Sequence, residues 1–517
     1  MAATFHIENF GCRAARADGE AIAALLRTAG ATASLPAESD VIIVNTCSVT
    51  AEADREARAY IRRAHRQNPQ ARIIATGCYA QRAPNEIAAL PGISAVIGNS
   101  HKALAPGIAL GFMKPFSMSG KSGKNLIQIE AAQAAAGAPQ VLADDTFAHS
   151  FLEEAPILPG AQTRPNLKIQ EGCSNRCSFC VIPQTRGHSR SISAGSVLNL
   201  VRSFIQSGGN ELVLSGINLG RWGRDLSPAN FTFVSGHDFG RADHGARRTP
   251  ASAPDKNSPL TLAALVRAIF EQTSLARLRL SSIEPMDWDA DLIAIVRDFS
   301  GTRLARHAHL PLQSGSDAVL RRMHRRYRPW HYADRIAELL RAAGSSLTLG
   351  ADVMVGFPGE SDREFQESCD FIRSLPFGYL HLFPFSPRPA TRAWSLHAEN
   401  PVPTQIVAER MAAMRALAAE KTRIHRAQFI CTELEAITLH TSQSLAAAGR
   451  TSALTENFLP VELAGNLPAN QLLRIRVTAL AADNTLLATT ALKANSCDVQ
   501  TPIATVQPAV PARGNAF

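Results

Sequence analysis

Short apolar runs alternate with amphipathic segments over the first hundred residues of the chain. The strand-like runs are Phe5–Ile7, Val41–Val44 and Arg72–Ala75. Between them, residues 19–30 and 51–67 repeat apolar positions every three or four residues, which is typical of helices. Strands that alternate with helices indicate a parallel sheet covered by helices. We therefore predict a Rossmann-like α/β domain over residues 1–102.

A second alternation occupies residues 164–395. Its strand candidates are Leu167–Gln170, Glu211–Ser215, Arg277–Ser281, His307–Leu312, Leu347–Val355 and Tyr379–Phe385. Helical patterns separate these runs, so the segment reads as six βα units, which favours a partial (β/α)6 barrel over a closed eight-stranded one. Residues 225–258 are polar and aperiodic and interrupt the pattern, so we predict a surface insertion there.

The remaining segments have simpler patterns. Residues 103–163 are rich in Ala, Gly, Ser and Pro, and we expect a connector. Residues 396–431 contain a basic amphipathic pattern that predicts a linker helix. Residues 432–500 hold short alternating runs separated by turn residues, which predicts a small β-barrel, and residues 501–517 form a tail.

Three cysteines lie within eight residues directly after the first strand of the second alternation. Cys173, Cys177 and Cys180 form a CxxxCxxC motif. Three thiolates can hold three irons of a cubane [4Fe–4S] cluster and leave the fourth iron open to a small molecule, whereas most cluster motifs supply four cysteines. The alternative is a zinc site with a distant fourth ligand, although zinc sites favour paired CxxC spacings.

Three more cysteines each follow a strand candidate of the first domain. These are Cys12, Cys47 and Cys78. Because the carboxyl ends of parallel strands lie along one edge of a sheet, we expect the three to meet although they are far apart in sequence. A second metal cluster is the favoured interpretation, and the alternative is three buried apolar cysteines.

Polar or glycine residues end the strands of the predicted barrel, on the rim where barrel enzymes carry their active sites. An open iron at this rim could bind S-adenosylmethionine through its amino and carboxylate groups. The candidates for contacts with this cofactor are Gly216, Asn218, Ser282, Glu284, Gln313, Ser314, Asp352 and Gly356. The alternative is ordinary loop composition, since loops favour such residues.

Charge and hydropathy narrow the function classes. The net charge is +9, and arginines cluster around residues 55–66, 321–328 and 388–426, which favours a polyanionic partner such as nucleic acid. A solvated helix face is the alternative for each cluster. No long uncharged apolar run or signal peptide is evident, so we expect no membrane association. Nine cysteines fit a reducing compartment, so we predict a cytoplasmic protein.

The CxxxCxxC motif, with Phe179 before its last cysteine, resembles the radical S-adenosylmethionine superfamily. The surrounding motifs are similar to those of the methylthiotransferases: Cys180-Val-Ile-Pro-Gln-Thr-Arg-Gly-His-Ser-Arg-Ser191, Leu214-Ser-Gly-Ile-Asn218, Leu310-Pro-Leu-Gln-Ser-Gly315 and Asp352-Val-Met-Val-Gly-Phe-Pro-Gly-Glu360. Residues 449–460 resemble a TRAM domain. The resemblance covers almost the whole chain.

This resemblance implies a two-cluster enzyme. The catalytic trio Cys173, Cys177 and Cys180 would hold the radical [4Fe–4S] cluster, and the other cysteine trio would hold an auxiliary [4Fe–4S] cluster that supplies sulfur. One S-adenosylmethionine would methylate that sulfur, and a second would yield the radical that drives insertion of the methylthio group. The implied partners are tRNA and an external electron donor, and we expect a monomer.

Several motifs look most like the branch that modifies C2 of N6-threonylcarbamoyladenosine 3′ to the tRNA anticodon. They are Asn45-Thr-Cys-Ser-Val-Thr50, Gly77-Cys-Tyr-Ala-Gln81 and His381-Leu-Phe-Pro-Phe-Ser-Pro-Arg-Pro389. The alternatives are the same chemistry on N6-isopentenyladenosine or on a ribosomal-protein aspartate and, in another class, a non-catalytic metal-containing RNA-binding protein.

Two positions depart from the pattern that the resemblance implies. Arg13-Ala-Ala-Arg16 follows Cys12 where the branch has a Val-Asn-Gln-like run. Asn210 stands where the superfamily often has an acidic residue after a glycine pair, so Glu211 is our candidate for that contact with the amino group of S-adenosylmethionine.

Overall fold

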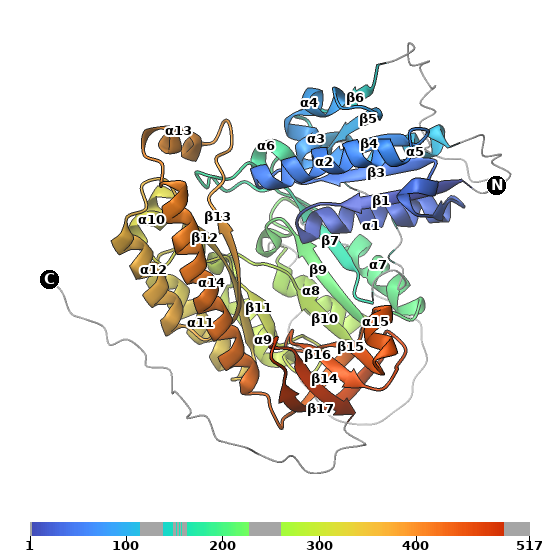
Figure 1. Ribbon diagram of the computed structural model, residues 1–517. Helices are drawn as coiled ribbons and strands as arrows, with labels where there is room; N and C mark the ends of the chain where they lie inside the picture. Colours follow the sequence, from blue (N-terminus) through green and yellow to red (C-terminus); the bar gives the residue numbers. More distant parts are fainter. Residues whose placement is uncertain are drawn as a thin grey trace.

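The computed structural model describes residues 3–113, 138–147, 163–226 and 260–490, together with Phe151, Ala155 and Ile157. Figure 1 shows an N-terminal α/β domain above a curved set of strands and helices, with a small β-barrel at the lower end. Most of the predicted insertion 225–258, much of the connector and the tail 501–517 lie outside the described residues.

The N-terminal domain is a doubly wound parallel sheet with strand order β2-β1-β3-β4-β5-β6. Its strands are β1 (Thr4–Asn9), β2 (Thr32–Ala33), β3 (Val41–Thr46), β4 (Arg72–Gly77), β5 (Ile93–Gly98) and β6 (Gln140–Leu142). Its α-helices are α1 (Arg13–Thr28), α2 (Ala51–Gln67), α3 (Cys78–Arg82), α4 (Pro84–Ala88) and α5 (Ala105–Phe112). The predicted Rossmann-like fold is confirmed.

Alternation within the central strand explains why helices cover both faces of this sheet. Val41 and Ile43 point into one core with α1 and α5, whereas Ile42 and Val44 point into a second core with α2 and α3. A strand that is apolar on both faces is typical of a buried parallel sheet. Helix α2 has the predicted bounds, while α1 begins at Arg13, six residues earlier than its apolar periodicity indicated.

The described residues of the second domain form six parallel strands in two sheets, one in the order β10-β9-β7 and one in the order β11-β12-β13. They are β7 (Asn166–Glu171), β9 (Glu211–Gly216), β10 (Arg277–Leu280), β11 (His307–His309), β12 (Thr348–Val355) and β13 (Phe377–Pro384). The short β8 (Arg190–Ser191) pairs antiparallel with β7. No described strand pairs β7 with β13, so the partial barrel is open on that side, as predicted.

In the part of the chain that the structure describes, seven α-helices belong to this barrel. They are α6 (Ile182–Arg186), α7 (Ala194–Gln206), α8 (Leu262–Gln272), α9 (Ala290–Phe299), α10 (Asp317–Arg322), α11 (Pro329–Ala343) and α12 (Asp362–Ser374). Their apolar faces join the strands in one continuous core. Helix α12 begins with a capping box, in which the Ser361 side chain accepts from the Glu364 N–H and the Glu364 carboxylate accepts from the Ser361 N–H.

The remaining described residues form α13 (Arg392–Glu399), the long α14 (Thr404–Ala427), α15 (Gln443–Ala447) and a closed barrel in the order β14-β15-β16-β18-β17. The strands are β14 (Glu433–Thr438), β15 (Arg450–Thr455), β16 (Pro460–Ala464), β17 (Leu472–Leu480) and β18 (Leu486–Thr490). The predicted small β-barrel is confirmed, although β15 was not predicted as a strand. Within the described ranges, no helix is both long and apolar enough to cross a membrane.

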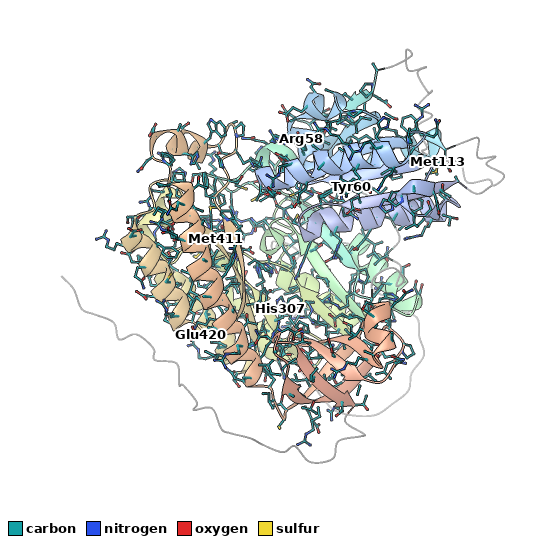
Figure 2. All side chains as sticks on the ribbon, viewed as in Figure 1. Arg58, Tyr60, Met113, His307, Met411 and Glu420 are labelled. Atoms are coloured by element: carbon teal, nitrogen blue, oxygen red, sulfur yellow. The ribbon has the colours of Figure 1, made fainter. Side chains whose placement is uncertain are left out.

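The small barrel docks against the amino ends of the larger barrel's strands. Asn210 donates to the Asn470 carbonyl at 2.8 Å, and Arg277 pairs with Glu435 at 2.8 Å. Figure 2 labels His307 where the strands of the partial barrel approach the C-terminal barrel. The cysteine loop that follows β7 lies at the opposite, carboxyl ends of these strands.

Candidate active site

The first cysteine trio lies on the loop after β7, where it is held by backbone contacts. The Cys173 N–H donates to the Gly187 carbonyl at 3.0 Å, and the Cys180 N–H donates to the Cys177 carbonyl at 3.2 Å. Between the last two cysteines, Ser178 donates its N–H to the Met323 carbonyl and its hydroxyl to the Arg322 carbonyl. The loop is therefore fixed to the carboxyl end of α10.

Two polar side chains face the sulfurs of this trio. Arg325 donates from Nη1 to Cys177 Sγ at 3.3 Å and pairs through Nη2 with Glu284. Asn218 Nδ2 lies 3.7 Å from Cys173 Sγ. Of the predicted cofactor contacts, Asn218 and Glu284 thus lie beside the trio.

The chemistry of the first trio fits an iron–sulfur cluster. Burial and the neighbouring Cys177 and Cys173 sulfurs raise the pKa of Cys180 to about 12. Burial also raises the pKa of Cys173, although the Asn175 N–H donates to its sulfur at 3.4 Å. All three thiols are free. Bound iron deprotonates a coordinating thiol, so a cationic cluster would offset the burial that raises these pKa values.

The second trio meets at one edge of the N-terminal sheet, as the strand-end argument predicted. Cys12 caps α1 after β1, Cys47 follows β3, and Cys78 begins α3 after β4. Burial, and then Cys78 and Cys12, raise the pKa of Cys47 to about 12. Gly11 has φ +101°, and a Cβ there would lie 2.6 Å from Cys47 Sγ, so only glycine fits this close approach. Three converging free thiols again fit a cluster.

One arginine connects the second trio to the loop of the first. Arg186, at the end of α6, donates from Nε to Cys78 Sγ at 3.3 Å, and its Nη2 is buried without a hydrogen-bond partner among the described residues. Asn99 donates to the same sulfur at 3.4 Å and to the Thr185 carbonyl at 2.8 Å. Because α6 begins two residues after Cys180, a short stretch of chain contacts both trios.

The interface between the two domains is a buried cluster of five charged side chains, defined here as the charge network. Its members are Asp18, Lys102, Lys168, Glu171 and Arg186. Burial lowers the pKa of Lys102 to about 8, although Asp18 and Glu171 oppose that shift. Such a network is sensitive to the loss of one member, because an unpaired buried charge is costly.

The other predicted cofactor contacts divide into two groups. Ser282 hydrogen-bonds with His309 Nδ1 at 2.7 Å, and Asp352 lies beside that histidine. Buried Gln313 has φ +65°, and its Oε1 has no hydrogen-bond partner among the described residues. By contrast, Ser314 hydrogen-bonds with Ser368 of α12 at 2.9 Å. Sequence reasoning cannot separate these groups, because both follow strands.

The predicted cofactor contacts also included two glycines, and Glu211 was our candidate for the amino group of S-adenosylmethionine. A Cβ at Gly356 would meet Val407 of α14 at 2.6 Å, and one at Gly216 would meet Gln170 at 2.9 Å, so both glycines allow close packing. Glu211 lies at the amino end of β9, where Arg279 and Arg277 bind it. Glu211 is therefore buried in ion pairs at the end of β9 that lies away from the cysteine loop, and the expectation that it contacts the amino group of S-adenosylmethionine is wrong.

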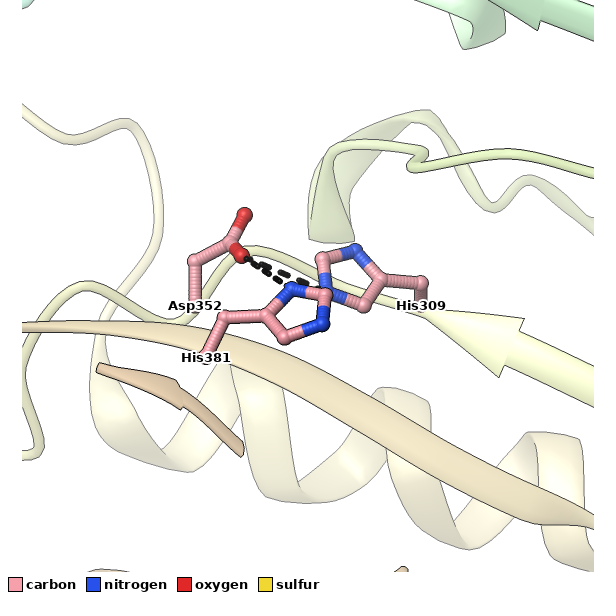
Figure 3. A group of neighbouring side chains, drawn as sticks. All are labelled: His309, Asp352 and His381. Carbon is pink, nitrogen blue, oxygen red and sulfur yellow. Dashed lines mark hydrogen bonds and ion pairs between the residues drawn. The ribbon is translucent and has the colours of Figure 1, made fainter. Parts of the chain in front are cut away.

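Figure 3 shows a His–Asp–His group inside the partial barrel, with His309 from β11, Asp352 from β12 and His381 from β13. Asp352 Oδ1 lies 3.4 Å from His309 Nε2 and 3.2 Å from His381 Nδ1. The His381 side chain is 56% exposed and Asp352 is 25% exposed, so this wall of the barrel is open. Burial raises the pKa of Asp352, but the two histidines outweigh it and the net shift is strongly downward.

Sequence reasoning missed Arg325, Arg186 and Asn99, which contact cysteine sulfurs. Arg325 was noted only as part of a basic cluster, and Arg388 of another cluster is buried against Asp54 at 2.7 Å. Some of the arginines that raised the net charge therefore have internal partners. No spacing rule links Asn99 or Arg186 to Cys78, because they come from different domains or elements.

A parallel-sheet domain with one cysteine trio, followed by an open parallel barrel with a CxxxCxxC loop, defines the class of radical S-adenosylmethionine enzymes. The Radical SAM superfamily profile matches residues 167–372, and the profile described as "Uncharacterized protein family UPF0004" matches residues 4–98.

Proteins of similar sequence identify the family within this class. Threonylcarbamoyladenosine tRNA methylthiotransferase MtaB of Bacillus subtilis is 31% identical, covering 90% of this chain and 91% of the relative. The protein of the same name from Aquifex aeolicus is 29% identical, covering 85% and 91%. A tRNA-2-methylthio-N(6)-dimethylallyladenosine synthase of a Sulfurihydrogenibium species is 29% identical, covering 76% and 78%. The chain belongs to the methylthiotransferase family of radical S-adenosylmethionine enzymes, and the predicted family is confirmed.

Proposed function

We propose that this enzyme adds a methylthio group to C2 of N6-threonylcarbamoyladenosine, 3′ to the anticodon of tRNA. The observation that carries the proposal is the pair of cysteine trios contacted by one short stretch of chain that ends at Arg186. Relatives that align over 85% or more of this chain bear the name of this activity. We propose that the enzyme acts on tRNA in the cytoplasm and receives electrons from an external donor. We also propose that it acts as a monomer.

We assign the cofactors as two [4Fe–4S] clusters and S-adenosylmethionine. Cys173, Cys177 and Cys180 would hold the radical cluster. Cys12, Cys47 and Cys78 would hold the auxiliary cluster. When bound, these groups supply a 5′-deoxyadenosyl radical and a sulfur atom for transfer.

The chain's own side chains have defined tasks around these groups. Arg325 would direct N–H donors at a sulfur of the radical cluster, and Arg186 would do so at the auxiliary cluster. Hydrogen bonds to cluster sulfurs tune the reduction potential. Asn218, Glu284, Ser282, Gln313 and Asp352 remain our candidates for orienting S-adenosylmethionine or the substrate base.

Nucleoside analysis tests the substrate assignment. We would express the chain in a bacterial strain that lacks its own enzyme for this modification and analyse hydrolysed tRNA by mass spectrometry. The 2-methylthio form of N6-threonylcarbamoyladenosine is expected with the wild-type chain and not with Cys78→Ala. Appearance of the methylthio group on isopentenyladenosine, or on a ribosomal-protein aspartate by intact mass, would instead support one of the alternatives.

A further inference from the structure

The residue after the first auxiliary cysteine points its charge into the partial barrel. The Arg13 guanidinium carbon lies 5.4 Å from the centroid of the Phe458 ring, which belongs to the C-terminal barrel. Burial, and then the charges of Arg279 and Arg13, lower the pKa of His307 on β11 well below its usual value. Arg13 therefore extends from the edge of the N-terminal domain toward the end of the partial barrel where the C-terminal barrel docks.

Aromatic rings and a second arginine surround this position. The guanidinium carbon of Arg279 lies 5.3 Å from the same Phe458 centroid. The rings of His307 and Tyr379 lie 4.4 Å and 5.5 Å from it. We call these five residues, Arg13, Arg279, His307, Tyr379 and Phe458, the floor cluster.

The floor cluster contains two arginines and no carboxylate of its own. Glu211 pairs with Arg279 at 3.1 Å, Arg277 at 3.3 Å and Arg164 at 3.6 Å, and Arg277 also pairs with Glu435 at 2.8 Å. No described residue forms an ion pair or hydrogen bond with Arg13. The Nη1 of Arg279, a side chain with no exposed surface, has no partner within the described part of the chain. A buried donor without an acceptor is costly, so this site suits an anionic ligand.

The wall above the floor cluster is polar and open. Tyr379 is half-buried, and its ring centroid lies 5.1 Å from that of His381, whose side chain is 56% exposed. An aromatic wall of this kind can stack against a planar base, as aromatic side chains do in single-stranded RNA recognition. A base lying on this wall would reach from the cysteines toward the floor cluster.

We propose that Arg13, with Arg279 behind it, binds the carboxylate of the threonyl group on the substrate base. This inference rests on the function proposed above. Threonylcarbamoyladenosine has a carboxylate at the end of its N6 substituent, whereas the isopentenyl substituent is uncharged and apolar. A guanidinium binds a carboxylate through charge-assisted hydrogen bonds with defined geometry. Arg13 directly follows Cys12, so this anchor would lie beside the cysteine trio of the auxiliary cluster.

Binding of anticodon stem-loops to the reconstituted holoenzyme tests the assignment. One stem-loop would carry N6-threonylcarbamoyladenosine, and the other would carry the same group with its carboxylate converted to a primary amide. We expect the wild-type enzyme to bind the carboxylate form roughly 10- to 100-fold more tightly. Arg13→Leu should remove most of that ratio, and Arg13→Lys should keep part of it. Arg16→Leu, exposed on the same helix, is the matched control and should keep the wild-type ratio.

Three results would overturn the assignment. Arg13→Leu could keep the wild-type ratio with a wild-type iron content, or it could weaken both stem-loops equally, which would place a backbone phosphate on Arg13. The wild-type enzyme could also bind both forms equally. Turnover of the carboxylate stem-loop by the same wild-type preparation separates the two proposals: conversion with an unchanged ratio in Arg13→Leu refutes only the carboxylate site, whereas no conversion refutes the proposed function as well.

Discussion

Each cysteine trio offers three thiol ligands, but the two trios are assembled in different ways. Cys173, Cys177 and Cys180 come from one loop, so their approach depends on local spacing. Cys12, Cys47 and Cys78 come from the ends of three strands and meet because these strands are parallel neighbours. A sequence motif can therefore identify the first trio, whereas the second is identified by the topology of the sheet.

Their surroundings differ as well. We call Cys173, Cys177 and Cys180 the radical trio and the other three cysteines the auxiliary trio. Within the described residues, the arginine that contacts the radical trio is Arg325, which also pairs with Glu284. The auxiliary trio is contacted by Arg186, which belongs to the charge network between two domains. The described residues around the radical trio thus come from the partial barrel alone, whereas the contacts of the auxiliary trio depend on docking of the two domains.

Removing one cysteine from each trio separates their roles and has the largest expected effect. Cys177→Ala should lower reductive cleavage of S-adenosylmethionine by roughly 10³-fold or more, because an essential group is lost. Cys47→Ala should keep that cleavage but lose methylthiolation of tRNA. The assay is 5′-deoxyadenosine and modified nucleoside from the same reaction. Loss of both products in both variants would show that the trios do not have separate roles.

Arg186→Met tests whether the charge network beside the auxiliary trio stabilises the folded protein. Asp18 and Glu171 would lose a buried partner, so we expect the free energy of unfolding to fall by about 3 kcal/mol. Urea denaturation of the apoprotein measures the loss. Arg202→Met, which removes an exposed arginine of α7, should change stability by less than about 0.5 kcal/mol. Equal effects of the two variants would contradict the structural role of the network.

Arg325→Met tests the partner on the radical side. Loss of the N–H donor and positive charge at Cys177 Sγ should lower the reduction potential of the radical cluster by on the order of 50 mV. An EPR-monitored redox titration measures the shift. Arg325→Lys should give a smaller shift, and exposed Arg326→Met should give none. An unchanged potential in Arg325→Met would mean that this contact does not tune the cluster.

The smallest effect concerns the segment that holds the radical loop. Burial would raise the pKa of Glu364, but hydrogen bonds from Arg322 and from the Ser361 N–H lower it to about 2. Since the folded pKa lies below the usual value, this group stabilises the protein above about pH 4.5. That contribution is lost as the pH falls toward about 2.

Glu364→Gln should therefore cost about 1 kcal/mol at pH 7. The difference from wild type should shrink as the solution is acidified. Thermal melting across this pH range is the measurement, with exposed Asp370→Asn of the same helix as the control. A difference that stays constant with pH would show that the carboxylate is not the stabilising group.

Much of this arrangement could be predicted from periodicity and spacing. The α2 bounds and the six barrel strands followed from apolar patterning, and Cys12, Cys47 and Cys78 followed from their positions after strands. The strands β5 and β15 were missed, because Ser94 and the polar start of β15 interrupt their apolar patterns.

Contacts between elements that are far apart in sequence could not be predicted. Arg186 meets Cys78 across 108 positions and Arg325 meets Cys177 across 148, and no local pattern encodes either pair. The roles of Ser314 and Asn218 also look alike in sequence. Only the packing of α12 and of the cysteine loop distinguishes them.

Iron content measured with ⁵⁷Fe Mössbauer spectroscopy tests the central claim most directly, namely that each trio holds a cubane cluster. The wild-type chain, reconstituted without oxygen, should contain about eight irons, all in [4Fe–4S] clusters. Replacement of either trio by alanine should leave about four. A wild-type content of about four irons, unchanged when Cys12, Cys47 and Cys78 are all replaced, would contradict the two-cluster account.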